Sequence, residues 1–322
     1  GFRIKSLAPE TYGRAIRTLE LFLGTLLDQT DRKLPDGFVV TLPKVTNAKQ
    51  VKDLARRLRK IEKDRKIAKD AIGIELMIET AEAIFDKRGR VAISAVVKAS
   101  RGRCSSVHFG AYDYTAALGI SASFQDIRHP ACSFARSVIQ TACAGSGVRV
   151  VDSVTTLMPV PVHRDETLTE TQRAENLRSV HAGWFRHFQN ISASMADGFY
   201  QSWDLHPNQL VARYAAVYAF FLTEMEAQAA RLKAFLAKAT QAGLTGNTFD
   251  DAASAQGLIN FFKLGWGCGA FSDEDLRTAT GLSPDNLSSS FAELTAQRLV
   301  KRPASAPRKV SHPPDRATGN DS

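Results

Sequence analysis

Cysteine is scarce in this chain of 322 residues, and long apolar runs are missing from it. The four cysteines lie far apart, with no CxxC pair and no histidines at zinc-finger spacing, so the sequence predicts neither a disulfide framework nor a zinc site. No apolar stretch approaches the ~20 residues that a membrane helix needs. The closest is YAAVYAFFL at 214–222. We therefore expect a soluble, cytoplasmic protein without a membrane partner.

Acidic residues are also fewer than basic ones, 33 against 42, which gives a net charge of +9. Much of the excess falls in two places, and neither requires nucleic acid. Residues 49–70 keep apolar side chains at helical spacing and mix acids among the bases, which predicts a helix with one buried face and one solvated basic face. Residues 301–322 are rich in Pro, Ser and charge without periodicity, which predicts a disordered tail. We expect no nucleic-acid partner, and the opposite hypothesis rests on the basic helix alone.

The length and composition suit one large folded domain. Hydrophobic residues make up 44% of the chain and charged residues 23%, as in ordinary globular enzymes. A single barrel of about 250 residues with an appendage fits the length better than several small domains. The chain begins with Gly, and its opening GFRIKSL has the pattern of a strand rather than of a signal peptide. We therefore expect that an N-terminal part precedes these residues in the natural protein.

Short β-rich segments alternate with helical stretches, a pattern that predicts a parallel sheet built from β/α units. An open doubly wound sheet is the alternative, but no glycine-rich phosphate loop follows an early strand. Six strands leave an eight-stranded barrel two short, so we expect a barrel that lacks its first two units. The expected strands are 2–6, 38–45, 72–80, 103–113, 149–158 and 198–207, and the clearest helices are 10–29, 130–145 and 207–239, the last as one helix or two abutting ones.

The predicted fold is thus an N-terminally truncated (β/α)8 TIM barrel with a C-terminal helical extension. The barrel domain is expected over residues 1–240, the helical appendage over 241–300 and the disordered tail over 301–322. Within the appendage, helices are expected at 252–264, 272–281 and 283–299. Ser272 and Ser283 are plausible first caps of the last two.

In barrels of this kind the active site lies at the C-terminal ends of the strands, so polar residues there are candidates for chemistry. Glu79 ends an otherwise apolar strand, and Asp113 ends the next expected strand just after FGAY. Adjacent parallel strands lie ~4.8 Å apart, so the two carboxylates could share a cation, and oxygen donors favour Mg2+ or Mn2+. An N-cap role for Asp113 is an equal alternative. Glu75 lies on the same face but deeper, which indicates a packed and paired residue.

Five segments, in order, resemble the citrate-lyase-β, malyl-CoA-lyase and HpcH/HpaI aldolase superfamily, whose fold is a barrel of the phosphoenolpyruvate/pyruvate type. The run IELMIETAEAI resembles the "IET" strand of that superfamily, and VHFGAYDYTAALGI resembles its "fGxxDla" strand and loop. FRIK, TLPKV and GFYQSWDLHPNQL resemble its arginine-bearing strand, its "lPKv" strand and its closing "GfxGkxxIHPxQ" segment. The resemblance spans residues 2 to about 220, is loose after 240, and is closest to an uncharacterised branch.

The resemblance implies a divalent-metal-dependent carbon–carbon lyase or aldolase that acts through a metal-stabilised enolate. The implied small-molecule substrate is a 2-oxo acid or a 3-hydroxyacyl compound, with a coenzyme A thioester as one candidate. Carried over residue by residue, Glu79 and Asp113 become the ligands of Mg2+ or Mn2+, and Arg3 becomes the guanidinium that faces the substrate carboxylate or the enolate oxygen. The alternative for Arg3 is an ion pair inside the barrel.

Two further candidates lie at the end of the second expected strand and in the LHP turn. Lys44 is a candidate catalytic residue, with pairing to Glu75 or Glu79 as its alternative role. His206 is a candidate substrate-binding residue, with shaping of the closing loop as its alternative.

No general acid or base stands out, and the run Ser106-Val107-His108 departs from the more apolar run that is usual in the superfamily. A catalytically inactive barrel that serves as a binding or regulatory subunit is therefore the alternative function. Barrels of this superfamily often assemble symmetrically, so we expect a homo-oligomer. Histidines and aspartates that could supply the missing acid or base are His108, His129, His163, His181, Asp152 and Asp204.

Overall fold

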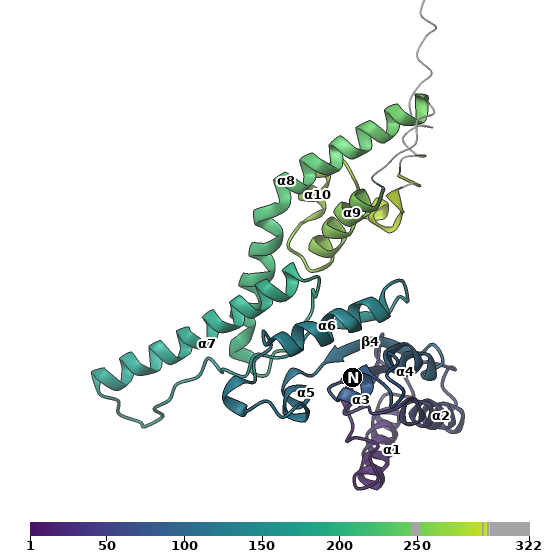
Figure 1. The fold of residues 1–322 in the computed structure, drawn as a ribbon, viewed down its shortest axis with the longest axis vertical. Helices are drawn as coiled ribbons and strands as arrows, with labels where there is room; N and C mark the ends of the chain where they lie inside the picture. Colours follow the sequence, from purple (N-terminus) through teal and green to yellow (C-terminus); the bar gives the residue numbers. More distant parts are fainter. Residues whose placement is uncertain (246–251, 292, 295, 297–322) are drawn as a thin grey trace, which may run out of the picture. The chain divides into compact units, whose positions relative to one another are not determined.

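The computed structural model describes residues 1–245 and 252–296, apart from 292 and 295. The chain divides into two compact units, Gly1–Val217 and Tyr218–Ser322. In Figure 1 the first unit runs from purple to teal and the second from green to yellow. The expected disordered tail, 301–322, lies outside the described residues.

A five-stranded parallel sheet forms the centre of the first unit, and each strand pairs with the next one along the chain. A doubly wound sheet would reverse its strand order partway, whereas this sheet runs β1-β2-β3-β4-β5 without reversal. Within the described residues the sheet lacks the reversal of a doubly wound sheet, and the α/β class is confirmed, while closure into eight strands stays a prediction. The strands are β1 (Phe2–Arg3), β2 (Val39–Leu42), β3 (Gly73–Ile78), β4 (Cys104–Phe109) and β5 (Arg149–Val151).

The crossover helices cover one face of this sheet. Apolar residues of the strands and of the helices form a single buried cluster, to which Leu19, Leu54, Ile93 and Ile139 each bring one helix. Helix α2 shows why: Val51, Leu54 and Leu58 recur at helical spacing and are buried, and the predicted amphipathic helix is thereby confirmed. The helices are α1 (Tyr12–Gln29), α2 (Ala48–Arg65), α3 (Ala81–Ile84), α4 (Ile93–Ala99), α5 (Ala111–Ala117), η1 (Ala122–Phe124) and α6 (Pro130–Cys143).

The opposite face of the sheet is polar. Successive side chains of a strand alternate between faces, so residues in register on neighbouring strands share a face. The register pairs Arg3 with Thr41, Thr41 with Glu75, and Glu75 with Ser106. Charged and hydroxyl side chains therefore form a row across the face that the crossover helices do not cover.

The sixth expected strand, at 198–207, is wrong as a strand. Trp203 makes a single isolated parallel bridge with Val154, and the Asp152 backbone N–H donates to the Gln201 carbonyl at 2.8 Å. The segment therefore lies beside the end of β5 without regular pairing. β5 has only three residues, Arg149–Val151, and is too short for a neighbouring strand to pair with it regularly.

The fourth expected strand is too long. β4 ends at Phe109, and Asp113 lies in the first turn of α5 rather than at a strand end. The run AYDYTAA contains three alanines, the residue with the highest helix propensity, so the chain turns into a helix directly after Gly110.

Two long helices follow the sheet. Helix α7 (Glu170–Ala196), for which the sequence pattern led us to no prediction, begins with a capping box between Thr169 and Gln172. A short turn, η2 (Pro207–Gln209), leads into α8 (Leu210–Thr245). The stretch expected as one helix or two is thus a single helix after its first turn.

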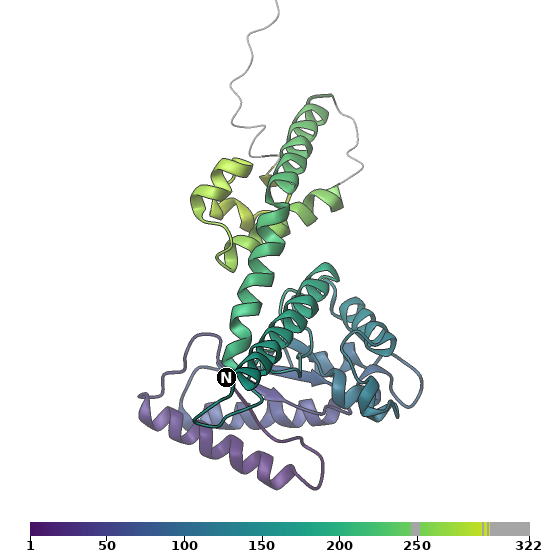
Figure 2. The ribbon, with the colours of Figure 1, turned by 90° about the vertical axis from the view of Figure 1, so that its left-hand side faces the viewer.

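The second unit is helical in the part that the structure describes. It contains the later part of α8, α9 (Ala252–Gly267), α10 (Asp273–Thr280) and η3 (Pro284–Ser288). Figures 1 and 2 show α9 and α10 beside α8, and Phe221 of α8 lies 5.2 Å from Phe261 of α9 between ring centroids. Ser272 caps α10, as predicted. The helix expected at 283–299 begins instead as the 3-10 turn after Ser283 and is interrupted at 289–290; helical residues resume at 291, and 292, 295 and 297–299 lie outside the described residues. Within the described residues, none of the helices combines the length and the apolar character that a bilayer crossing requires.

Candidate active site

A cavity of about 220 Å³ lies at the carboxyl ends of β3 and β4, where enzymes of the β/α-barrel type place their chemistry. Arg3, Glu79 and Asp113 all line it, and Lys44 contacts both carboxylates, so the fold brings together four of the five candidate site residues. The full lining is Arg3, Met77, Glu79, Phe109, Gly110, Ala111, Tyr112, Asp113, Ser153, Val154, Trp203 and Leu205.

Glu79 is a buried carboxylate with one oxygen free. It lies one residue beyond β3 with 4% of its surface exposed, and its Oε1 accepts a 2.7 Å hydrogen bond from the backbone N–H of Lys44. Its Oε2 makes no hydrogen bond within the described part of the chain. Burial raises the pKa of Glu79, the Lys44 N–H opposes that rise, and the charge of Asp113 adds to it. A cation in the cavity would relieve this unfavourable burial.

Gly110 explains how Glu79 reaches its position. A Cβ atom at Gly110 would lie 2.5 Å from the Glu79 Cβ and 2.6 Å from its Oε2, closer than such atoms approach one another. Any residue with a Cβ atom at position 110 would therefore clash with the Glu79 side chain in its present position.

Lys44 connects the two carboxylates. Its backbone N–H binds Glu79, and its ammonium group lies 2.8 Å from Asp113 Oδ1. The hydrogen bond to Asp113 raises the pKa of Lys44. Lys44 has φ 50, in the left-handed region that is unfavourable for a side chain with a Cβ. The alternative role for Lys44 was pairing with Glu75 or Glu79. Its backbone N–H binds Glu79, whereas its ammonium group pairs with Asp113.

Arg3 has no carboxylate partner among the described residues. It is the last residue of β1, its Nη1 lies 3.8 Å from the Met77 sulfur, and its guanidinium carbon lies 5.9 Å from the centroid of the Trp203 ring. The alternative of an ion pair inside the barrel is therefore absent from the described contacts. Most of the guanidinium donors remain free to bind an anion in the cavity.

The donor set fits Mg2+ or Mn2+, although it is small. No group of three or more His, Cys, Asp or Glu side chains able to hold a metal ion occurs in the residues that the structure describes. Mg2+ commonly binds through one or two carboxylates and fills its other positions with water and substrate oxygens. That pair is supplied by the free Oε2 of buried Glu79 and by the half-exposed carboxylate of Asp113. In the structure, the Lys44 ammonium balances the charge of Asp113.

His206 does not line the cavity. It precedes η2, and its Nδ1 accepts a 3.1 Å hydrogen bond from the backbone N–H of Asn208. Its substrate-binding role stays a prediction, whereas its contact in the structure is that of the alternative role, a residue that shapes the closing loop.

Glu75 is paired, as its place on the strand indicated. Its carboxylate accepts hydrogen bonds from Thr41 at 2.8 Å and from Ser106 at 3.0 Å, and His108 lies 3.4 Å from it. These neighbours, His108 first, lower the pKa of Glu75 to about 2, so it is ionised at neutral pH.

Trp203, Met77 and Ser153 also line the cavity, and the sequence pattern did not single them out. Met77 could have been found by alternation, because it lies between Glu75 and Glu79 on the same face. Trp203 could have been found from its place beside His206 in the closing segment. Ser153 carries no signal in the sequence, since its position depends on where β5 ends.

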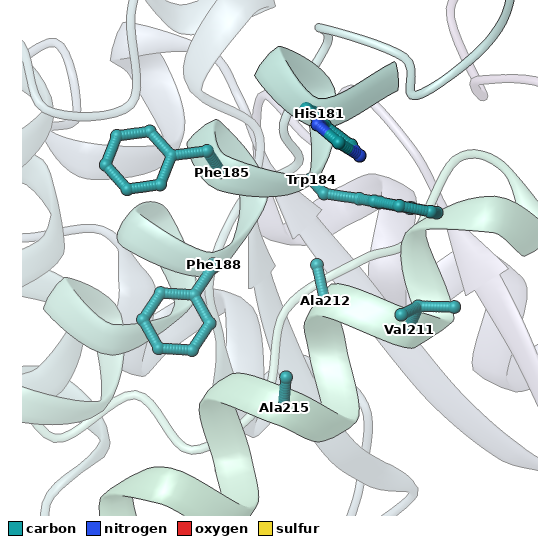
Figure 3. A pocket seen from close by; sticks show the side chains of 7 residues that line it. All are labelled: His181, Trp184, Phe185, Phe188, Val211, Ala212 and Ala215. Atoms are coloured by element: carbon teal, nitrogen blue, oxygen red, sulfur yellow. The ribbon is translucent and has the colours of Figure 1, made fainter. Parts of the chain in front are cut away.

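A second cavity, of about 420 Å³, lies between α7 and α8 within the first unit. Figure 3 shows Phe185 and Phe188 on α7 opposite Val211 and Ala215 on α8. Its lining includes His181 but no carboxylate, lysine or arginine, so it offers neither the carboxylate pair nor the guanidinium of the first cavity.

Comparison with known proteins supports the fold. The crystal structure of a citrate lyase from Burkholderia xenovorans LB400 matches with a TM-score of 0.54 at 17% identity, covering 85% of this chain and 75% of that chain. Haloferax volcanii malate synthase, in its lead(II) complex, matches with a TM-score of 0.48 at 14% identity, covering 92% of this chain and 78% of that chain. The first likeness confirms the expected resemblance at the level of fold.

Sequence comparison identifies a family but no activity. No curated protein matches the chain. Residues 1–294 match the model of a family described as a domain of unknown function, DUF6986. Because that match covers well over half of its length, the chain belongs to the DUF6986 family.

Proposed function

We propose that this protein is a divalent-metal-dependent carbon–carbon lyase or aldolase. The observation that carries the proposal is one cavity that holds two carboxylates, Glu79 and Asp113, and the guanidinium of Arg3, which has no carboxylate partner among the described residues. Cleavage of a carbon–carbon bond beside a carbonyl group leaves negative charge on the carbonyl oxygen, and fixed cationic groups lower the barrier to that step. The fold likeness to a protein named a citrate lyase agrees with this chemistry.

The substrate class follows from the size and charge of the cavity. At about 220 Å³ the cavity is smaller than the ~300–1,000 Å³ of sites for drug-sized ligands, so the reacting part of the substrate is small. The planar fork of Arg3 suits a carboxylate, which it can bind through two parallel hydrogen bonds. A 2-oxo acid meets both conditions, and so does a 3-hydroxyacyl compound that carries a carboxylate; the remainder of a coenzyme A thioester would extend outside the cavity.

Glu79 and Asp113 would hold Mg2+ or Mn2+. When bound, the ion supplies Lewis-acid stabilisation of the developing negative charge. Glu79 would contribute a ligand oxygen from a buried side chain, and Asp113 would contribute one from a half-exposed side chain. The Lys44 ammonium compensates the charge of Asp113, and it would leave that carboxylate when Asp113 binds the metal ion. Arg3 binds and orients the substrate anion.

Proton exchange at the methyl group of pyruvate tests this proposal. In D2O with Mg2+ present, the protein should exchange these protons faster than Mg2+ alone, as followed by proton NMR. Glu79→Gln and Arg3→Ala should each slow the exchange at least tenfold, because each removes a charged group from the cavity. Glu82→Gln is the matched control, since Glu82 is an exposed carboxylate on α3 and lies outside the cavity. Absence of exchange above the Mg2+ background would refute the lyase proposal.

A catalytically inactive binding or regulatory subunit is the second candidate function. One observation favours it: the Lys44 ammonium already pairs with Asp113 at 2.8 Å, so the cavity can bind an anion at Arg3 without a metal ion. This function predicts that pyruvate binds equally well with and without Mg2+ and that its methyl protons do not exchange.

A further inference from the structure

A continuous hydrogen-bonded chain crosses the polar face of the sheet and ends at the cavity. Its members come from three strands and from the closing segment that contains Trp203. Thr41 donates to Glu75 at 2.8 Å, and Ser106 donates to Glu75 at 3.0 Å. The His108 Nε2 lies 2.8 Å from the Ser106 hydroxyl oxygen, and the Trp203 Nε1 lies 2.6 Å from the His108 Nδ1.

The direction of each bond follows from elementary chemistry. An indole N–H can only donate, so the His108 Nδ1 must accept from Trp203. The imidazole proton therefore lies on Nε2 and is donated to Ser106, whose own hydroxyl proton goes to Glu75. Every donor in the chain meets an acceptor, and His108 is only 6% exposed. A fully satisfied buried network of this kind is rigid.

The network fixes a side chain that the backbone leaves weakly held. Trp203 has a single isolated bridge to Val154, and the segment around it forms no regular strand. The His108 imidazole lies 5.4 Å from the Trp203 ring between centroids, at an interplanar angle of 86°. The orientation of the indole is thus determined by the imidazole edge to which it donates.

Trp203 in turn contacts Arg3. The guanidinium carbon of Arg3 lies 5.9 Å from the Trp203 ring centroid, within the range of a cation–π interaction. Arg3 ends a strand of two residues, and its other described side-chain contact is the Met77 sulfur at 3.8 Å. An arginine with so few contacts would sample many rotamers, and the indole face restricts it to those that reach the cavity.

We propose that Trp203, held in place by His108, is a positioning residue that orients the Arg3 guanidinium for binding of an anionic substrate. This inference rests on the proposed role of Arg3 in binding that anion. It gives a function to the hydrogen-bonded chain from Glu75 to Trp203. None of the residues in this chain is a proposed metal ligand. His108, which we considered as an acid or base from the sequence, acts here through Trp203.

Binding of pyruvate to the full chain, measured by calorimetry, tests the inference. Trp203→Phe keeps an aromatic ring but removes the N–H, and His108→Leu removes the acceptor. Each should weaken binding about three- to tenfold. His108→Asn places an amide oxygen near the position of Nδ1 and should restore binding to within about twofold of the natural protein. In an Arg3→Ala background, Trp203→Phe should have no further effect, because Trp203 acts through Arg3.

The outcomes separate this inference from the proposed function. If Arg3→Ala abolishes binding but Trp203→Phe is harmless, the positioning role is overturned and the site proposal stands. If Trp203→Phe still weakens binding in the Arg3→Ala background, Trp203 contacts the ligand directly and the inference is overturned. If the natural protein does not bind pyruvate, the site proposal fails, and the positioning is judged by a measurement without ligand.

That measurement is the Nε–H resonance of Arg3 in a nitrogen–proton correlation spectrum, assigned from its loss in Arg3→Lys. The ring current of Trp203 shifts this resonance when the indole and the guanidinium are held together. His108→Leu should move it and His108→Asn should restore it. A resonance that is the same in all three proteins would overturn the inference whatever the ligand, and circular dichroism confirms that each variant is folded.

Discussion

Lys44 should weaken the binding of a divalent cation rather than assist it. Its ammonium lies 2.8 Å from Asp113 Oδ1, and both side chains are about half exposed, 55% and 50%. A cation that binds to Asp113 and Glu79 has to displace this ammonium or tolerate its charge. Lys44→Met keeps much of the side-chain length, removes the charge, and leaves the backbone N–H that binds Glu79.

The magnitude follows from the exposure of the pair. Exposed ion pairs contribute about 0.2–1 kcal/mol. A change of 1.4 kcal/mol corresponds to a factor of ten in an equilibrium constant. If the cation must break a pair worth ~0.5–1 kcal/mol, removal of Lys44 should tighten cation binding about two- to fivefold. The gain should shrink at high salt, because exposed charges are screened.

Mn2+ titration by calorimetry at low and high salt measures this effect. Lys98→Met is the matched control, since Lys98 is an exposed lysine of α4 that makes no ion pair within the described residues. It should leave the Mn2+ affinity unchanged. Weaker Mn2+ binding in Lys44→Met than in the control would refute the reasoning, because it would mean that Lys44 supports the cation site instead of competing for it.

Three further results are expected. Glu62→Gln should lower the free energy of unfolding by about 3–5 kcal/mol in urea titrations, since it breaks a pair with Arg103 whose two side chains are each only 2% exposed. Burial alone would raise the pKa of Glu62, but Arg103 and two backbone N–H groups hold that pKa below its usual value. The stability that ionised Glu62 contributes is therefore lost as the pH falls through this lowered pKa. On acidification, Glu62→Gln should accordingly lose less stability than the natural protein. Gly110→Ala should weaken Mn2+ binding at least tenfold by displacing Glu79, whereas Gly13→Ala, where an added Cβ meets no atom within 4 Å, should not. Removal of divalent ions with EDTA should abolish pyruvate proton exchange, and added Mn2+ should restore it.

The sequence predicted the order of the strands better than their ends. Alternation of β-rich and helical segments was sufficient for the parallel sheet, because each crossover helix has a clear apolar face. Asp113 shows the limit. The pattern continued the strand through FGAYD, but Gly110 lets the chain turn under Glu79, and the following alanine-containing run forms a helix. Such a turn depends on contacts between strands that no local pattern contains.

The strand pattern also predicted part of the candidate site. Glu79 and Arg3 lie on or next to strands, so alternation and register place them on one face of the sheet. Trp203 could not be placed by these rules, because its segment forms one isolated bridge and its orientation depends on a hydrogen bond to His108, 95 residues away in the chain. The pairing of Lys44 with Asp113 was also missed, since it joins residues 69 apart in the chain and Asp113 lies in a helix rather than at the expected strand end.

The affinity of the protein for Mn2+, compared between the natural chain and Glu79→Gln, tests the central claim most directly. Glu79 is the buried carboxylate with a free oxygen in the cavity, so the account predicts measurable Mn2+ binding that Glu79→Gln abolishes and Glu82→Gln leaves intact. Equal Mn2+ affinity in the natural protein and in Glu79→Gln would contradict it.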